Sequence, residues 1–289
     1  MPTPFFDSEL ERLLADDVPH GDLTTDALGL EAATGRMDFA ARGAMVVALA
    51  EASARIIELA GGRVTLFARS GASLPAGAPI LSATGPAPAL LRGWKVAQTL
   101  IEIWAGVASA ARDIVAEARA GAPDISVVCT RKNIPGTKKF AVAAVEAGGA
   151  AMHRLGLSET ILVFPEHLAF LSGLTLNEAA AKLRRQAPEK KLTLEARTHD
   201  EALAAARAGF DVIQAEKFSP QAISRLAEAL REKPNRPLLA AAGGVKRDNA
   251  RAYAEAGADI LVTSAPYSAP PKDVAVNFVA DCQAFTPIA

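Results

Sequence analysis

Hydrophobic and polar positions follow one pattern in the first part of the chain and another beyond about residue 120. Between Met37 and Ile80, short strand-like runs surround one helical run, "EASARIIELAG", and Gly and Pro turns separate them. From Ala87 to Ala120, apolar residues recur every three or four positions, which predicts a long helix with one apolar face. The first part is therefore expected to be a small α/β layer followed by a linking helix.

Beyond residue 120, apolar runs of strand length alternate with helical runs of roughly a dozen residues. The strand-like runs are "ISVVCT", "TILVF", "KLTLEA", "DVIQAE", "PLLAAAGG" and "DILVTSA". Parallel strands need long crossover connections, so this alternation predicts successive βαβ units. Six or seven units favour a closed or nearly closed α/β barrel, although an open parallel sheet would give the same pattern.

Charge narrows the classes of partner. The 289 residues include 31 Lys and Arg against 32 Asp and Glu, a formal net charge of -1, which argues against nucleic-acid or membrane-surface binding as the main activity. No apolar run approaches the roughly 20 residues of a membrane helix, and the first residues do not resemble a signal peptide. We therefore expect a cytoplasmic protein with no nucleic-acid or membrane partner.

Residues suited to catalysis or ligand binding directly follow the strand-like runs. In a barrel of this kind the carboxyl ends of the strands carry the catalytic groups. The residues expected at that end are Arg131, Lys132, His153, Arg154, Glu195, Glu216, Gly243, Gly244, Thr263 and Ser264. Cations, two carboxylates and small residues at one mouth suit a phosphorylated, metal-bound substrate.

Each of these signals also has a plainer interpretation. Arg131 and Lys132 suit carboxylate or phosphate oxygens, but loop cations are common. Glu195 and Glu216 could hold magnesium, or could be rim charges paired with neighbouring cations. The Gly pair could receive a phosphate ahead of a helix, or could only form a turn.

Several motifs, taken in order along nearly the whole chain, resemble the quinolinate phosphoribosyltransferase family. They are "DDVPHGDLTTDAL", "TRKNIPG", "GGAAMHRLGL", "GGV" and "SAP". The longer stretches "CTRKNIPGTKKFAV" and "HRLGLSETILVFPEH" resemble its ModD branch, whose genes accompany molybdate transporters. The resemblance implies a mixed α/β N-terminal domain, residues 1–108 completed by about 272–289, and an incomplete barrel of the seven-stranded type, residues 109–271.

The resemblance also implies an activity and a set of roles. The family transfers the phosphoribosyl group of phosphoribosyl pyrophosphate to the nitrogen of an aromatic acid, with magnesium, and works as a homodimer whose active sites are completed across the interface. Lys132, Glu195 and Glu216 would be catalytic, the two glutamates also holding magnesium. The acceptor and phosphate would be bound by Lys95, Arg131, Lys138, His153, Arg154, Phe164, Gly243, Gly244, Thr263 and Ser264.

Departures from the family pattern fall mostly on the acceptor side. Lys95 and Lys138 stand where quinolinate enzymes carry arginines, and Phe164 stands where they carry a lysine. On the donor side Glu216 replaces an aspartate and Ala242 removes a hydroxyl. The sequence therefore predicts a phosphoribosyltransferase with an acceptor other than quinolinate. The alternatives are a true, decarboxylating quinolinate enzyme of NAD biosynthesis, and a non-catalytic anion- or nucleotide-binding protein linked to molybdate uptake.

Overall fold

The computed structural model describes residues 4–171, 173–232 and 235–281. Contacts within the chain divide it into two units. The first contains the residues up to Ser109, Lys139–Gly149 and the chain from Ala269, and the second contains Ala110–Lys138 and Ala150–Ser268. Within the described ranges, no helix combines the length and apolar character needed to span a lipid bilayer.

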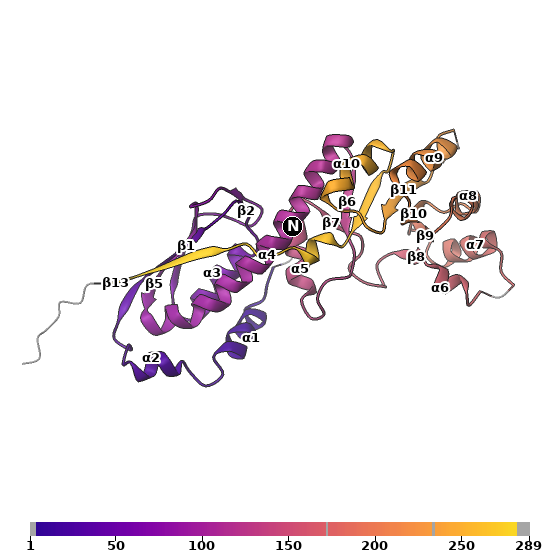
Figure 1. Ribbon diagram of the computed structural model, residues 1–289. Helices are drawn as coiled ribbons and strands as arrows, with labels where there is room; N and C mark the ends of the chain where they lie inside the picture. The colour runs from indigo at the N-terminus through magenta and orange to yellow at the C-terminus, as the bar shows by residue number, and fades with distance from the viewer. Residues whose placement is uncertain (1–3, 172, 233–234, 282–289) are drawn as a thin grey trace, which may run out of the picture. The chain divides into compact units, whose positions relative to one another are not determined.

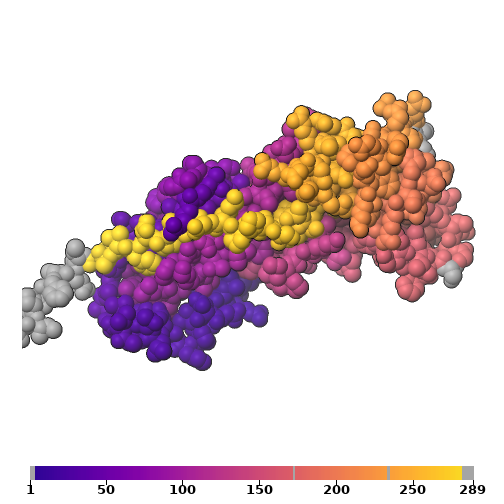
Figure 2. Space-filling view, in the orientation of Figure 1, coloured from indigo at the N-terminus to yellow at the C-terminus, as the bar shows by residue number. Residues whose placement is uncertain are grey.

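The first unit is built on a four-stranded antiparallel sheet in the order β13-β1-β5-β3 (Figure 1). Every second residue of β1 is buried, as a sheet with one covered face requires, and Met37 and Phe39 are almost inaccessible. Figure 2 shows the yellow C-terminal strand against the indigo N-terminal part of the chain. The strands are β1 (Thr34–Ala41), β3 (Arg63–Leu66), β5 (Pro79–Pro86) and β13 (Val274–Ala280), with the small pair β2 (Met45–Val46) and β4 (Ser73–Leu74).

Helices α1 (Asp7–Asp17), α2 (Leu23–Ala27) and α3 (Ala50–Leu59) also belong to the first unit. The predicted long helix is confirmed as α4 (Ala87–Gly121), which runs from the first unit into the second.

The sequence placed α5 (Lys138–Ala147) in the second domain, yet nearly all of it belongs to the first unit. The reason is aromatic packing, because Phe140 stacks on Phe5 and on Trp104. Residues 282–289 of the predicted C-terminal return lie outside the described residues.

The second unit confirms the predicted incomplete barrel. Its seven parallel strands have the order β7-β6-β12-β11-β10-β9-β8, so that among the described residues β7 and β8 are edges that do not pair with each other. The strands are β6 (Ser126–Cys129), β7 (Ala151–Met152), β8 (Ile161–Val163), β9 (Leu192–Ala196), β10 (Val212–Glu216), β11 (Leu238–Ala242) and β12 (Ile260–Thr263).

Helices connect the later strands of this sheet (Figure 1). They are α6 (Pro165–Leu168), α7 (Leu176–Gln186), α8 (His199–Arg207), α9 (Pro220–Leu230) and α10 (Arg247–Glu255), with a 3-10 turn, η1 (Ala265–Ser268), after β12. Thr175, Thr198 and Ser219 cap three of them by accepting a backbone N–H. These caps fix the first turns of α7, α8 and α9.

Candidate active site

A cavity of about 1240 Å³ opens at the carboxyl ends of the parallel strands, entirely within the second unit. It gathers most of the residues that the sequence singled out. These are Arg131, Lys132, His153, Arg154, Phe164, Glu195, Glu216, Gly243, Gly244, Thr263 and Ser264.

Two predicted residues, Lys95 and Lys138, are not in its lining. The Lys95 ammonium lies in the first unit, donating to Gln98 at 3.1 Å and standing 4.2 Å from the centre of the Trp94 ring. Lys138 is an exposed residue that begins α5.

Two carboxylates and an amide line the cavity on neighbouring strands. Glu195 and Gln214 are direct partners in the β9–β10 register, and Glu216 lies two residues beyond Gln214, so both side chains of β10 point to the same face. The Gln214 amide donates to the Glu195 carboxylate at 3.0 Å. Burial and the nearby Glu216 carboxylate raise the pKa of Glu195, while Arg197 and Gln214 act in the opposite direction. A buried carboxylate with a second carboxylate beside it favours a cation between the two.

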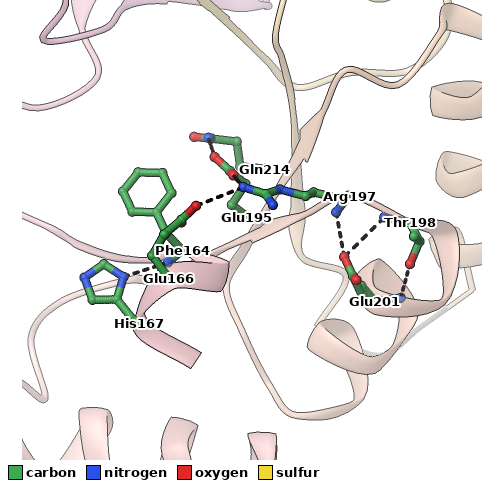
Figure 3. A network of polar contacts seen from close by, with 8 residues as sticks. All are labelled: Phe164, Glu166, His167, Glu195, Arg197, Thr198, Glu201 and Gln214. Carbon is green, nitrogen blue, oxygen red and sulfur yellow. Dashed lines mark hydrogen bonds and ion pairs between the residues drawn. The ribbon is translucent and has the colours of Figure 1, made fainter. Parts of the chain in front are cut away.

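Arg197 was not a predicted site residue, although its place two positions after Glu195 made it a candidate partner for that carboxylate. Its guanidinium lies 3.7 Å from Glu195 and 3.1 Å from Glu166 (Figure 3). Glu166 follows Phe164 at the start of α6. Arg197 therefore links the carboxylate pair to the segment that carries Phe164, a connection between loops that no sequence spacing reveals.

The cavity lining also holds cations, Arg131, Lys132 and Arg154, that form no ion pair within the described residues. Arg154 is 6% exposed, yet the described part of the chain offers it no ion pair. Burial, together with the neighbouring Arg131 guanidinium, lowers the pKa of Arg154. The Phe164 ring lies 5.7 Å from the Arg154 guanidinium and stacks on His167 at 5.8 Å. A buried guanidinium without a partner lowers the free energy of unfolding, so the surroundings of Arg154 favour an anionic ligand.

The lining as a whole has a positive excess. Besides the three glutamates, Glu166, Glu195 and Glu216, it holds the six cations Arg131, Lys132, Arg154, Arg197, Lys217 and Lys246. Lys217 and Lys246 were not predicted site residues, and the signal that could have found them is their position just after a strand end. In a chain whose formal net charge is -1, this local excess favours polyanionic substrates.

Gly243 and Gly244 form the turn between β11 and α10, with φ of +81° and +91°. A side chain at Gly243 would meet the Glu216 carboxylate oxygen at 2.6 Å, whereas one at Gly244 would meet nothing within 4 Å. Gly243 therefore allows Glu216 to lie against the turn. Thr263 is buried and its hydroxyl donates to the Val245 carbonyl oxygen at 2.6 Å, so it fixes this turn from the neighbouring strand.

His153, which also lines the cavity, has a pKa that gives a pH-dependent test of its burial. Burial and the Arg154 charge lower the pKa of His153 below its ordinary value. As the pH falls through about 6.5, the unfolded chain takes up a proton that the folded chain resists, so stability is lost. We expect His153→Asn to gain in free energy of unfolding relative to native protein between pH 8 and pH 5.5, measured by urea denaturation. A pH-independent difference would contradict this assignment.

Comparison with known proteins identifies the family to which the chain belongs. The model for the quinolinate phosphoribosyl transferase N-terminal domain matches residues 22–104, and that for the C-terminal domain matches residues 107–277. The ModD protein of Rhodobacter capsulatus, a candidate pyrophosphorylase, is 46% identical over 84% of this chain and 94% of its own. ModD of Pasteurella multocida is 37% identical over 94% of this chain and 97% of its own.

Among solved structures, the fold is similar to that of the nicotinate-nucleotide pyrophosphorylase of Francisella tularensis. The TM-score is 0.87 at 22% identity, over 96% of this chain and 98% of that one. The two domain models, the ModD relatives and this fold all agree. The chain belongs to the quinolinate phosphoribosyl transferase family, which is a family of pentosyltransferase enzymes.

Proposed function

We propose that this chain transfers the phosphoribosyl group of phosphoribosyl pyrophosphate to an aromatic acid other than quinolinate. The acceptor nitrogen would attack the anomeric carbon of the ribose while its bond to the pyrophosphate oxygen breaks, so that pyrophosphate leaves. The observation that carries this proposal is the pairing, in one cavity, of a carboxylate centre with a buried, unpaired guanidinium at Arg154. The first suits a metal and a cationic sugar, and the second suits an acid.

Each side of the cavity has a distinct task in this reaction. Arg131 and Arg154 would hold the acceptor carboxylate, and Lys132 would neutralise charge on the donor. The Gly243 turn, ahead of the α10 N-terminus, would bind the 5'-phosphate through backbone N–H groups. Charge builds on the departing pyrophosphate as the sugar carbon becomes cationic, and fixed charges of both signs lower that barrier.

The carboxylate oxygens in the cavity fit magnesium. Within the described residues, no group of three or more His, Cys, Asp or Glu side chains forms a closed metal cage. Glu195 and Glu216 instead provide two oxygen ligand groups, and magnesium commonly uses one or two carboxylates together with substrate phosphates. When bound, magnesium would neutralise charge on the diphosphate. We propose that these two residues hold it jointly with the donor.

Donor binding gives the direct test. We expect phosphoribosyl pyrophosphate with magnesium to raise the melting temperature. At a ligand concentration of 100 times the dissociation constant, the free energy of unfolding should increase by about 2.7 kcal/mol. Glu216→Gln should lose the magnesium dependence of this shift, because one of the two carboxylates is gone. A panel of aromatic acids, with pyrophosphate release as the measured signal, then identifies the acceptor. If millimolar donor produces no shift with or without metal, the transferase proposal is wrong.

We also propose that the enzyme is a homodimer in which Lys95 completes the partner's site. Lys95 stands where quinolinate enzymes carry an arginine, and the active sites of the family are completed across the dimer interface. Lys95→Ala and Glu195→Ala chains should each be inactive alone, and mixing them should restore part of the activity in heterodimers. Sedimentation would establish the oligomeric state. Full activity in a monomeric species would rule out a shared site.

A further inference from the structure

A second cavity, of about 480 Å³, adjoins the active cavity within the same unit. It lies where β9 and β10 give way to α8 and α9, and it shares two lining residues, Arg197 and Lys217, with the active cavity. Its lining is Arg197, Thr198, His199, Lys217, Phe218, Ser219, Ala222 and Arg225. Three of these side chains are permanent cations, one is an imidazole, and the described lining contains no carboxylate.

Two of these cations, Lys217 and Arg225, are solvent-exposed and lack a carboxylate partner among the described residues. Across residues 4–171, 173–232 and 235–281, neither Lys217 nor Arg225 forms an ion pair. Glu201 is not in the lining and caps the start of α8, accepting the backbone N–H groups of Arg197 at 2.7 Å and Thr198 at 3.2 Å (Figure 3). The cavity therefore has a positive charge that the protein itself does not balance.

Neutral donors in the same cavity could complete an anion shell. The hydroxyl oxygens of Thr198 and Ser219 each accept a backbone N–H, at 3.2 Å from Glu201 and from Ala222, respectively. In each case the hydroxyl hydrogen remains able to donate to a ligand. Lys217 has a φ of 59°, unusual for a residue with a side chain, and its N–H donates to the Ala242 carbonyl at 2.7 Å. Lys217 lines both cavities.

We propose that this second cavity is a binding site for a phosphate-class dianion, beside the active cavity with which it shares Arg197 and Lys217, and not dependent on the transfer reaction. Lys217 and Arg225 supply the charge, and Thr198 and Ser219 supply hydroxyl donors. A dianion fits better than a monoanion because two uncompensated cations face the cavity. Neither the family match nor the similarity to ModD proteins assigns a ligand to these residues.

Equilibrium dialysis with radiolabelled inorganic phosphate tests the site through Arg225→Glu. Arg225 lies in the second cavity but not in the active cavity, so the active site keeps all its residues. The matched control is Arg207→Glu, an exposed arginine at the end of α8 that lines neither cavity and changes the net charge equally. We expect Arg225→Glu to bind one phosphate per chain fewer than Arg207→Glu over a range in which native protein saturates. Arg225→Lys should bind within about threefold of native protein.

The same three proteins separate specific binding from a general charge effect. An equal loss in the Arg225→Glu and Arg207→Glu variants, or no loss in either, would overturn the proposal. Because the difference between variants is measured, the result does not depend on whether phosphate also enters the active cavity. Repeating the dialysis with ribose 5-phosphate distinguishes the source of the ligand. Arg225 dependence for inorganic phosphate alone indicates a free anion, and dependence for both indicates that a phosphate monoester also fits.

Discussion

Native protein should use quinolinate at least tenfold less efficiently than the Phe164→Lys variant, judged by kcat/KM for pyrophosphate release. Quinolinate carries two carboxylates, and Arg131 with Arg154 can hold one of them. Phe164 lines the same cavity but presents only a ring, which stacks on His167 and packs near Arg154. A hydrogen bond to a charged group contributes roughly 1.5 to 3 kcal/mol, about ten- to more than a hundredfold in binding of the transition state.

The alternative is that Lys138 or Lys139 supplies the missing charge. The structure argues against Lys139, because its ammonium pairs with Glu9 and lies 5.0 Å and 4.8 Å from the centres of the Phe5 and Phe6 rings in the first unit. Phe164→Leu is the matched control, since it removes the ring without adding charge. A gain in both variants would show that space, not charge, limits quinolinate. High native turnover of quinolinate would contradict the acceptor assignment itself.

Gly243→Ala should reduce kcat by about 100-fold, because misplacing a catalytic group by an ångström has that order of effect. An added methyl group would stand 2.6 Å from the Glu216 carboxylate and 2.7 Å from the Lys217 side chain, so both must move. The variant also forces alanine into a left-handed backbone conformation, at about 1 to 2 kcal/mol. Loss of the magnesium-dependent thermal shift should accompany the loss of rate.

Gly244→Ala separates these two effects. It has the same left-handed conformation, with φ of +91°, but a methyl group there has open space around it. Its loss of stability, measured by thermal unfolding, should match the backbone part of the Gly243→Ala effect, while kcat should change much less. Equal losses of rate in the two variants would show that Glu216 is not displaced, and that the turn acts only through its backbone.

Much of the fold was determined by local sequence. Alternating strand and helix runs predicted the parallel sheet, and the apolar spacing of residues 87 to 120 predicted the long helix, now α4. These signals are local because hydrophobic periodicity reflects which face of each element is buried. Residues after the strand ends could also be identified, because the carboxyl ends of parallel strands meet at one edge. Thus eleven of the predicted residues line one cavity.

Tertiary structure decided what depends on distant parts of the chain. The membership of α5 in the first unit results from Phe140 meeting Phe5 and Trp104, which are far from it in sequence. The ion pair of Arg197 with Glu166 of α6 follows from the approach of two segments about 30 residues apart in the chain. Sequence spacing carries no such distances. Only the folded chain shows which cations are paired and which, like Arg154, are buried without a carboxylate and therefore available to a substrate.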